Sequence, residues 1–276
     1  MVHDALREAW SRDGFFFARG LVAAATVAAL TDELIGRIRG NPPDQHPGQD
    51  FYFLDADLAV TTETDPTPEA AHAEDWVSKL FSAHTIGAGL QLAGDSAITD
   101  VVAALLDDDD IDCFQSQFIL KNPGVIGQPW HQDSYYFAFD RQPQIGVWVA
   151  LSEATLANGC LWVLPGSHTG RIHRHVPDRR PAANRGYLEI IDQDTRAETP
   201  ALMAPGDVLF FHSFLMHRSK DNLANTRRAA MVYHYGRAGT RGRTPEVDAA
   251  LAHVNRWVPV RRRAREPGAP ASGTTP

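Results

Sequence analysis

The sequence is poor in the features that support several common classes of protein. It holds two cysteines, Cys113 and Cys160, and no CxxC pair or Cys/His cluster, which excludes a disulfide framework and argues against structural zinc. We interpret both thiols as reduced. The longest apolar run, residues 21–30, is too short for a membrane span, and acidic Asp4 lies where a secretory signal carries only positive charge. The sequence therefore predicts a soluble, cytoplasmic protein.

Basic residues are also in the minority. The chain of 276 residues carries 26 Lys and Arg against 34 Asp and Glu, for a formal charge of −8. This balance argues against a protein that follows nucleic-acid phosphates and against a polybasic membrane anchor. The sequence has no internal repeat, Walker loop, GxGxxG or GxSxG motif, which removes the usual nucleotide-binding and α/β-hydrolase interpretations. We expect a partner that is a small molecule.

The elements that the sequence predicts change in character near residue 112. Helices are predicted at residues 4–12, 23–39 and 96–106, with a short strand at 14–20 and loops at 41–50 and 63–74. Beyond residue 112, short runs of β-branched and aromatic residues alternate with turn residues. Strands are predicted at 113–121, 145–151, 160–164, 207–211 and 229–235. Many short strands joined by Gly-rich turns favour a sandwich or jelly roll over a βαβ sheet.

Two of the 12 histidines form a candidate metal site with one carboxylate. His131 and Asp133 are separated by one residue, so on a strand their side chains share a face. His72 and Glu74 have the same spacing within a polar stretch, so the spacing alone is weak evidence. A third candidate, His217, follows a long interval. Two histidines and one carboxylate on one face of an octahedral iron leave three positions open, as in non-haem Fe(II) oxygenases.

The distal part of this pattern leaves two alternatives open. His212 competes with His217, and because five residues separate them they face oppositely on a regular strand. Downstream, Arg227 and Arg228 lead into the strand predicted at 229–235 and place a guanidinium beside the proposed cavity. Arginine forms bidentate pairs with carboxylates, so it could hold the far acid group of 2-oxoglutarate while the keto-acid end chelates iron.

Several short motifs, each weak alone, occur together in order. They are Pro129-Trp-His-Gln-Asp133, Gly146-Val-Trp148, Ala157-Asn-Gly159, Pro165-Gly-Ser-His168 and His217-x-Ser219-x-x-Asn222, with Arg228 following. Between about residues 14 and 235 the chain resembles the phytanoyl-CoA dioxygenase (PhyH-like) family of Fe(II)/2-oxoglutarate oxygenases, especially its phytanoyl-CoA dioxygenase domain-containing branch. One departure is Ala224, where many relatives have Ser or Thr.

The resemblance implies a mainly β fold with flanking helices, a double-stranded β-helix (jelly roll, cupin-like). The core would span about 112–237, with helical support at about 1–111. Together they would form one oxygenase domain at 1–260, followed by a disordered tail at 261–276. The strands that carry the motifs fall in both halves of any two-domain division, which favours the single domain.

The resemblance also assigns roles to residues. The iron ligands would be His131, Asp133 and His217. Arg228, favoured over Arg227 by the family spacing, would bind the 2-oxoglutarate carboxylate, with Ser219 as a second hydrogen-bond partner. Gln117 and Trp148 would line the cosubstrate pocket. Related halogenases replace the carboxylate ligand with Gly or Ala, so Asp133 argues against halogenation.

The implied activity is an Fe(II)- and 2-oxoglutarate-dependent dioxygenase that uses O₂, hydroxylates an unactivated C–H bond of a small molecule and releases succinate and CO₂. Alternatives are desaturation, cyclisation or epoxidation by the same chemistry, and a non-catalytic metal-binding jelly roll, which would be expected to have lost a ligand or the arginine. A zinc hydrolase would not need Arg228 and Ser219. The basic residues 171–180 indicate a solvated loop more than a lid that recognises an anionic substrate.

Overall fold

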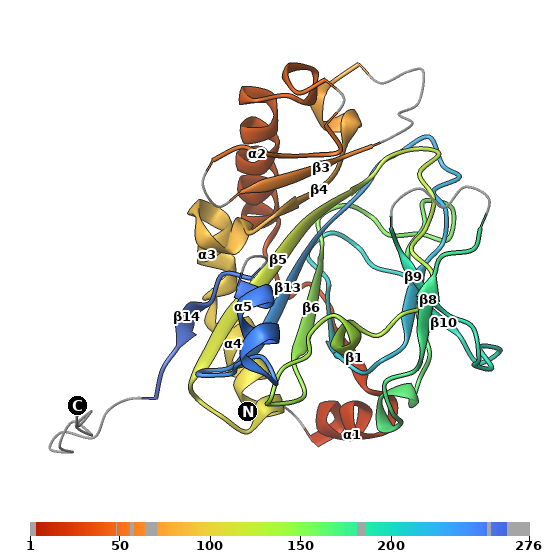
Figure 1. Cartoon of the computed structure of the whole chain (residues 1–276). Coiled ribbons are helices and arrows are strands. Elements are labelled where there is room, and N and C mark those ends of the chain that lie inside the picture. The colour runs from red at the N-terminus through yellow and green to blue at the C-terminus, as the bar shows by residue number, and fades with distance from the viewer. Residues whose placement is uncertain are drawn as a thin grey trace, which may run out of the picture.

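A large antiparallel sheet organises the molecule (Figure 1). The computed structural model describes residues 4–47, 49–55, 58–63, 71–180, 186–252 and 255–263. The sheet has nine strands in the order β1-β11-β6-β13-β5-β4-β3-β2, with β14 also paired to β5. Its strands are β1 (Phe15–Ala18), β2 (Phe51–Phe53), β3 (Ala59–Thr62), β4 (Val77–Phe81), β5 (Ile111–Lys121), β6 (Ile145–Ala150), β11 (Val208–His212), β13 (Arg228–Arg237) and β14 (Val258–Arg261).

A smaller sheet lies against one face of the large one. It has the order β10-β7-β12 and is accompanied by the pair β8-β9. The bounds are β7 (Leu161–Val163), β8 (His175–Pro177), β9 (Leu188–Ile190), β10 (Thr199–Ala201) and β12 (His217–Ser219). Two antiparallel sheets built from strands distant in sequence give the double-stranded β-helix that the sequence predicts.

Helices α2 (Ala24–Gly40), α3 (Gly87–Ala93) and α4 (Ser96–Leu106) cover the opposite face of the large sheet (Figure 1). The other helices are α1 (Asp4–Asp13) and α5 (Pro245–Ala252). On β13, Met231 and Tyr233 pack with the helices, whereas Ala230 and Val232 pack between the sheets. Side chains alternate across a strand, so β13 is buried on both faces and is apolar almost throughout. The core therefore has two layers, and the candidate site lies in the layer between the sheets.

Most of the predicted elements are present, with corrections in the N-terminal third and at the metal motif. The helices predicted at 4–12, 23–39 and 96–106 and the five strands after residue 112 are confirmed within one or two residues. The region predicted as helical support also contributes β1, β2, β3 and β4, of which only β1 was predicted. The extended strand assumed around the metal motif is wrong, because Asp133 begins a short 3-10 helix, η4 (Asp133–Tyr135). The disordered tail predicted at 261–276 is wrong at its start, because Arg261 ends β14 and pairs with Ile111 on β5. Residues 264–276 lie outside the described residues.

Within the described part of the chain, no individual helix combines the length and apolar character needed to cross a membrane. Among the described helices, only α3 and α4 taken together have that length and apolar character, and the pair is bent by 45°.

Candidate metal centre and cosubstrate pocket

The structure brings together the three side chains that the sequence predicts as metal ligands. The amide of His131 donates to the carbonyl of His217 at 3.0 Å, and the amide of His217 donates back to the carbonyl of His131 at 3.1 Å. This reciprocal pair holds the two imidazole centroids 4.1 Å apart. Asp133 Oδ1 lies 3.6 Å from His131 Nε2 and 3.7 Å from His217 Nε2. All three side chains are buried, and their ligand atoms fall within 4.8 Å of one another.

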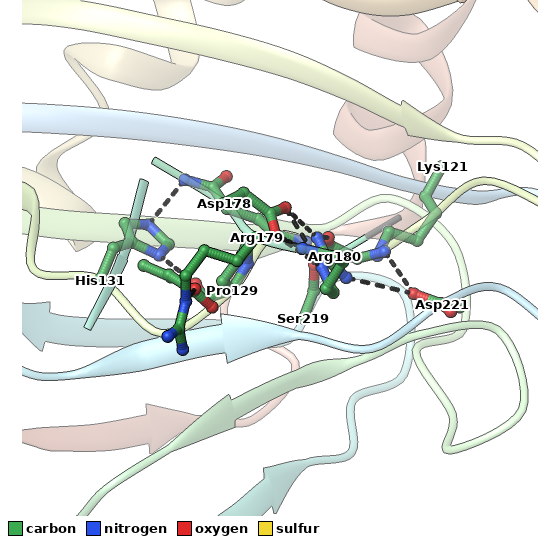
Figure 2. Close-up of polar contacts among 11 residues, drawn as sticks. Lys121, Pro129, His131, Asp178, Arg179, Arg180, Ser219 and Asp221 are labelled. Carbon is green, nitrogen blue, oxygen red and sulfur yellow. Dashed lines mark hydrogen bonds and ion pairs between the residues drawn. The ribbon is translucent and has the colours of Figure 1, made fainter. Parts of the chain in front are cut away.

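The hydrogen bonds around this cluster set the imidazoles up as metal ligands. His131 Nδ1 donates to the Pro129 carbonyl at 2.8 Å (Figure 2), and His217 Nδ1 donates to the Leu215 carbonyl at 3.0 Å. With the proton held on Nδ1, the lone pair of each Nε2 points toward Asp133. The side-chain amide nitrogen of Gln128 lies 3.1 Å from His131 Nε2 and must move away from that nitrogen when a metal binds. One carboxylate and two imidazoles suit a divalent first-row metal with open positions.

Burial and neighbouring groups keep His131 and Asp133 in the protonation states that a metal requires. Burial, followed by the nearby His217, lowers the pKa of His131 to about 3, so its ring is neutral. Burial alone would raise the pKa of Asp133. The imidazoles of His217, His234 and His131 outweigh it and hold that pKa well below its usual range, so the carboxylate is ionised.

His212 does not reach this cluster. Its ring packs 5.6 Å from Trp10 and 5.3 Å from His168, between centroids, and its Nδ1 accepts from the Phe214 amide. Phe211, its neighbour on β11, packs between the sheets, and side chains alternate along a strand, so His212 faces away from the smaller sheet. The structure thus places His217, rather than His212, beside His131 and Asp133.

Arg228 is a buried cation whose hydrogen bonds are incomplete. Its side chain is 2% exposed, and neither Nε nor Nη1 has a hydrogen-bond partner among the described residues. Burial lowers its pKa to about 10. Its guanidinium lies 5.4 Å from the centroid of the Trp148 ring, whose buried Nε1 also has no hydrogen-bond partner among the described residues. A buried charge without a partner is costly, so this corner of the cavity favours an anionic ligand.

Lys121 adds a buried amino group to the same corner, and burial, followed by the nearby Arg228, lowers its pKa well below the usual range. Its backbone is the direct cross-strand partner of Arg228. Its Nζ donates to Ser219 Oγ at 2.8 Å and to the Lys220 carbonyl at 2.5 Å, and Figure 2 shows Lys121 and Ser219 close together. Ser219 Oγ also accepts from the backbone N–H of Gln128 at 3.1 Å, which leaves the hydroxyl proton of Ser219 for a further acceptor. The geometry fits a carboxylate bound by Arg228 and Ser219.

Arg227 belongs to a different part of the structure. Its Nε donates to Asn122 Oδ1 at 2.5 Å, and its guanidinium forms an ion pair with Asp75. The two adjacent arginines therefore point to opposite sides at the start of β13, and only Arg228 lines the cavity.

One cavity of about 460 Å³ connects these groups. Its lining includes the three candidate metal ligands, Arg228, Ser219 and the two predicted pocket residues Gln117 and Trp148. The metal cluster and the anionic corner are thus two parts of one site.

A family model described as phytanoyl-CoA dioxygenase (PhyH) matches residues 10–230. The chain belongs to the phytanoyl-CoA dioxygenase family. Among its curated relatives, phytanoyl-CoA dioxygenase domain-containing protein 1 of Bos taurus is 36% identical over 128 residues, which cover 44% of this chain and 43% of the relative. The peroxisomal phytanoyl-CoA dioxygenase of Homo sapiens is 35% identical over 113 residues, 40% of this chain and 33% of that protein. The matched segments thus span less than half the length of these relatives.

Solved structures share the fold of this PhyH-family chain. EctD from S. alaskensis, 22% identical, superposes with a TM-score of 0.64 over 88% of this chain and 80% of its own. The epimerase SnoN, in complex with Fe3+, alpha ketoglutarate and nogalamycin RO, is 17% identical with a TM-score of 0.64 over 98% of this chain and 96% of its own.

Two residues of the site were missed from sequence. His234 Nε2 donates to Asp133 Oδ2 at 3.0 Å, and Lys121 holds Ser219. Even spacing from Arg228 along β13 puts His234 on the cavity face, which is a signal the sequence contains. Nothing comparable identifies Lys121, since its role depends on the register between β5 and β13.

The bond from His234 to Asp133 is expected to support metal affinity. A His234→Leu variant should bind Fe(II) about 10- to 100-fold more weakly, because an outer hydrogen bond orients the ligand carboxylate. Competition with a chromophoric chelator under anaerobic conditions measures this. His168→Leu, which changes a half-buried histidine outside the cavity lining, serves as the control. Equal affinities in the two variants would contradict this role for His234.

Proposed function

We propose that this chain is an Fe(II)- and 2-oxoglutarate-dependent dioxygenase that oxidises an unactivated C–H bond of a small molecule and releases succinate and CO₂. The observation that carries the proposal is the combination of a buried His131-Asp133-His217 cluster with the unpaired cation of Arg228 in one cavity. Membership of a family named for a dioxygenase supports it.

Each residue has a defined task in this proposal. His131, Asp133 and His217 would hold Fe(II) on one face, leaving positions for 2-oxoglutarate and O₂. Bound iron and 2-oxoglutarate supply the oxidising chemistry. Arg228 and the Ser219 hydroxyl bind the far carboxylate of 2-oxoglutarate, and Trp148 lies against Arg228. The walls between the sheets exclude water from the reacting groups.

The size of the cavity limits the substrate. Its volume of about 460 Å³ lies in the lower part of the range of about 300–1,000 Å³ for small-molecule sites. Part of that volume must accept 2-oxoglutarate, so only a compact part of the substrate enters. We favour hydroxylation, or another oxidative outcome, over halogenation, since the carboxylate ligand Asp133 is present and leaves no ligand position for halide.

The test of this proposal separates an oxygenase from its alternatives. The protein is mixed anaerobically with Fe(II) and 2-oxoglutarate, and the weak visible charge-transfer band is recorded. Air is then admitted and succinate is measured. We expect the band and O₂-dependent succinate. A non-catalytic jelly roll would give the band without succinate, and a zinc hydrolase would give neither but would act with Zn²⁺ alone.

We also infer that the substrate is anionic, from the basic segment 171–180. In the segment 171–180, Arg179 pairs with Glu189 and Arg180 with Asp178, whereas Arg171 and Arg174 are exposed. Gln132 of the metal motif donates to the Arg171 carbonyl at 3.1 Å, which ties this segment to the site.

The anionic substrate is tested with a double variant. Arg171→Ala with Arg174→Ala should raise KM about three- to tenfold for an acidic substrate found by a metabolite screen, since each exposed pair contributes up to about 1 kcal/mol. Uncoupled 2-oxoglutarate turnover should not change. An unchanged KM would show that the segment is a solvated loop.

A further inference from the structure

The cavity reaches a part of the chain that the family model does not include. That model ends at residue 230, whereas Leu251 and Asn255 line the cavity. Leu251 belongs to α5, and Asn255 follows it shortly before β14. Figure 1 shows α5 lying across β5 and β13 in this view. The C-terminal segment therefore forms a wall of the site.

This wall is held firmly in place. The backbone N–H of Asn255 donates to the Leu251 carbonyl at 3.0 Å, and the backbone N–H of Arg256 donates to the Phe114 carbonyl at 2.9 Å. The Trp257 ring stacks on Phe114 with centroids 4.9 Å apart, and β14 then pairs with β5. A side chain on this segment has a fixed position relative to the sheet.

Three amide side chains form a ladder along the cavity wall. Gln117 Nε2 donates to Gln115 Oε1 at 3.0 Å, and Gln115 Nε2 donates to Asn255 Oδ1 at 3.1 Å. Each bond fixes the orientation of the next amide, so the ladder ends on the NH₂ group of Asn255. Asn255 is 3% exposed, and its buried Nδ2 has no hydrogen-bond partner among the described residues. A buried donor without an acceptor is costly, so the position favours a ligand that supplies one.

The end of the ladder formed by Gln115 and Asn255 lies at the opposite end of the site from the anionic corner. Along the pairing of β5 with β13, Arg228 is opposite Lys121 at one end and His234 is opposite Gln115 at the other. His234 contacts the metal ligand Asp133. The cosubstrate carboxylate is assigned to the first end. The second end, beside the metal cluster, is left for the substrate.

We propose that Asn255 is a substrate-binding residue whose side-chain N–H donates to a carbonyl or carboxylate oxygen of the substrate. Gln115 and Gln117 are positioning residues that orient its amide. The apolar part of the substrate packs against Phe137 and Leu251, which line the same end of the cavity. This inference rests on the proposed function only in placing the substrate beside the metal cluster. It assigns substrate selection to a segment outside the family model.

A donor of this kind gives selectivity because a ligand without an acceptor oxygen binds with a less favourable free energy. An analogue without an oxygen at this point would leave the Asn255 N–H buried and unpaired. The expected signature is a change in preference between matched ligands rather than a general loss of binding.

The experiment uses three probes of similar shape: benzamide, benzoate and toluene. The ¹⁵N-labelled full chain is loaded with Zn²⁺ and 2-oxoglutarate, so that binding is measured without turnover. The side-chain NH₂ signal of Asn255 is assigned by its absence in Asn255→Leu. In the wild type, benzamide and benzoate should shift this signal. In Asn255→Leu, their affinity should fall at least about tenfold, while toluene binds equally or more tightly.

Two further variants separate positioning from structure. Gln115→Glu keeps the size of the side chain but removes the donor to Asn255 Oδ1, and it should lower the preference for benzamide over toluene. Asn158→Leu, in a turn outside the cavity lining, should not change that preference. Retained 2-oxoglutarate binding shows that each variant is folded.

The proposal is overturned if benzamide and toluene lose affinity by the same factor in Asn255→Leu, or if neither oxygen-bearing probe shifts the Asn255 signal. Both outcomes are independent of oxygenase activity. Failure of the proposed function would instead appear as a missing Fe(II)–2-oxoglutarate band in the wild type.

Discussion

Replacing His217 with alanine should reduce Fe(II) affinity by more than about 100-fold and abolish O₂-dependent succinate formation. The variant keeps only one imidazole and one carboxylate, and even the loss of an outer hydrogen bond to a ligand costs about 10- to 100-fold. The anaerobic charge-transfer band with 2-oxoglutarate, titrated against Fe(II), measures the affinity. The backbone bonds between His131 and His217 do not depend on the side chain, so the fold should remain.

The matched control is His212→Ala. This histidine ends the preceding strand, and its ring packs against Trp10 and His168 instead of facing the metal cluster. Its variant should lose some stability, because a half-buried ring that packs against Trp10 and His168 is removed, and keep the full band. A full band in His217→Ala, or its loss only in His212→Ala, would refute the assignment of the distal ligand.

Replacing Arg228 with leucine should have opposite effects on the free protein and on cosubstrate binding. Without 2-oxoglutarate, the variant should be at least as stable as the wild type, because a buried cation with two unpaired nitrogens is replaced by an apolar side chain. With 2-oxoglutarate, affinity should fall by about 2–5 kcal/mol, since one partner of a buried charge pair is missing.

Thermal unfolding of the Zn²⁺-loaded protein with and without 2-oxoglutarate measures both effects. Saturation at 100 times the dissociation constant stabilises a protein by about 2.7 kcal/mol, so the wild type should show a clear rise in Tm that the variant lacks. Arg227→Leu is the control. It breaks the contacts with Asp75 and Asn122, so its Tm should be lower while 2-oxoglutarate still raises it. A normal 2-oxoglutarate shift in Arg228→Leu would contradict the pocket assignment.

Much of the strand framework could be predicted because apolar and β-branched residues are concentrated in it. β6 and β13 are buried on both faces, so their sequences are nearly continuous apolar runs. The short strands β2 and β3 were missed because β2 is the edge strand and β3 lies next to it, both beside polar stretches where only some residues are buried. Edge strands carry a weaker pattern, since fewer of their side chains enter the core.

The candidate site could be predicted as a set of residue types but not as an arrangement. The motifs identified His131, Asp133, His217 and Arg228, although Asp133 lies on a 3-10 turn and not on the predicted strand. Lys121 could not be found, because its place beside Arg228 is a cross-strand register between segments about 100 residues apart. Local patterns do not encode such registers.

The reciprocal backbone bonds between His131 and His217 link metal binding to the local integrity of the fold. They join the segment at His131 to the start of β12, which is distant in sequence, so the entropic cost of bringing these two ligands together falls on folding and not on metal capture. Metal uptake should then need little rearrangement and be fast. Conversely, a local disturbance that breaks the pairing of His131 with His217 should release the metal while the helices on the far face of the large sheet stay intact. Metal retention would thus be an early indicator of opening at this pairing, before any change in helical content.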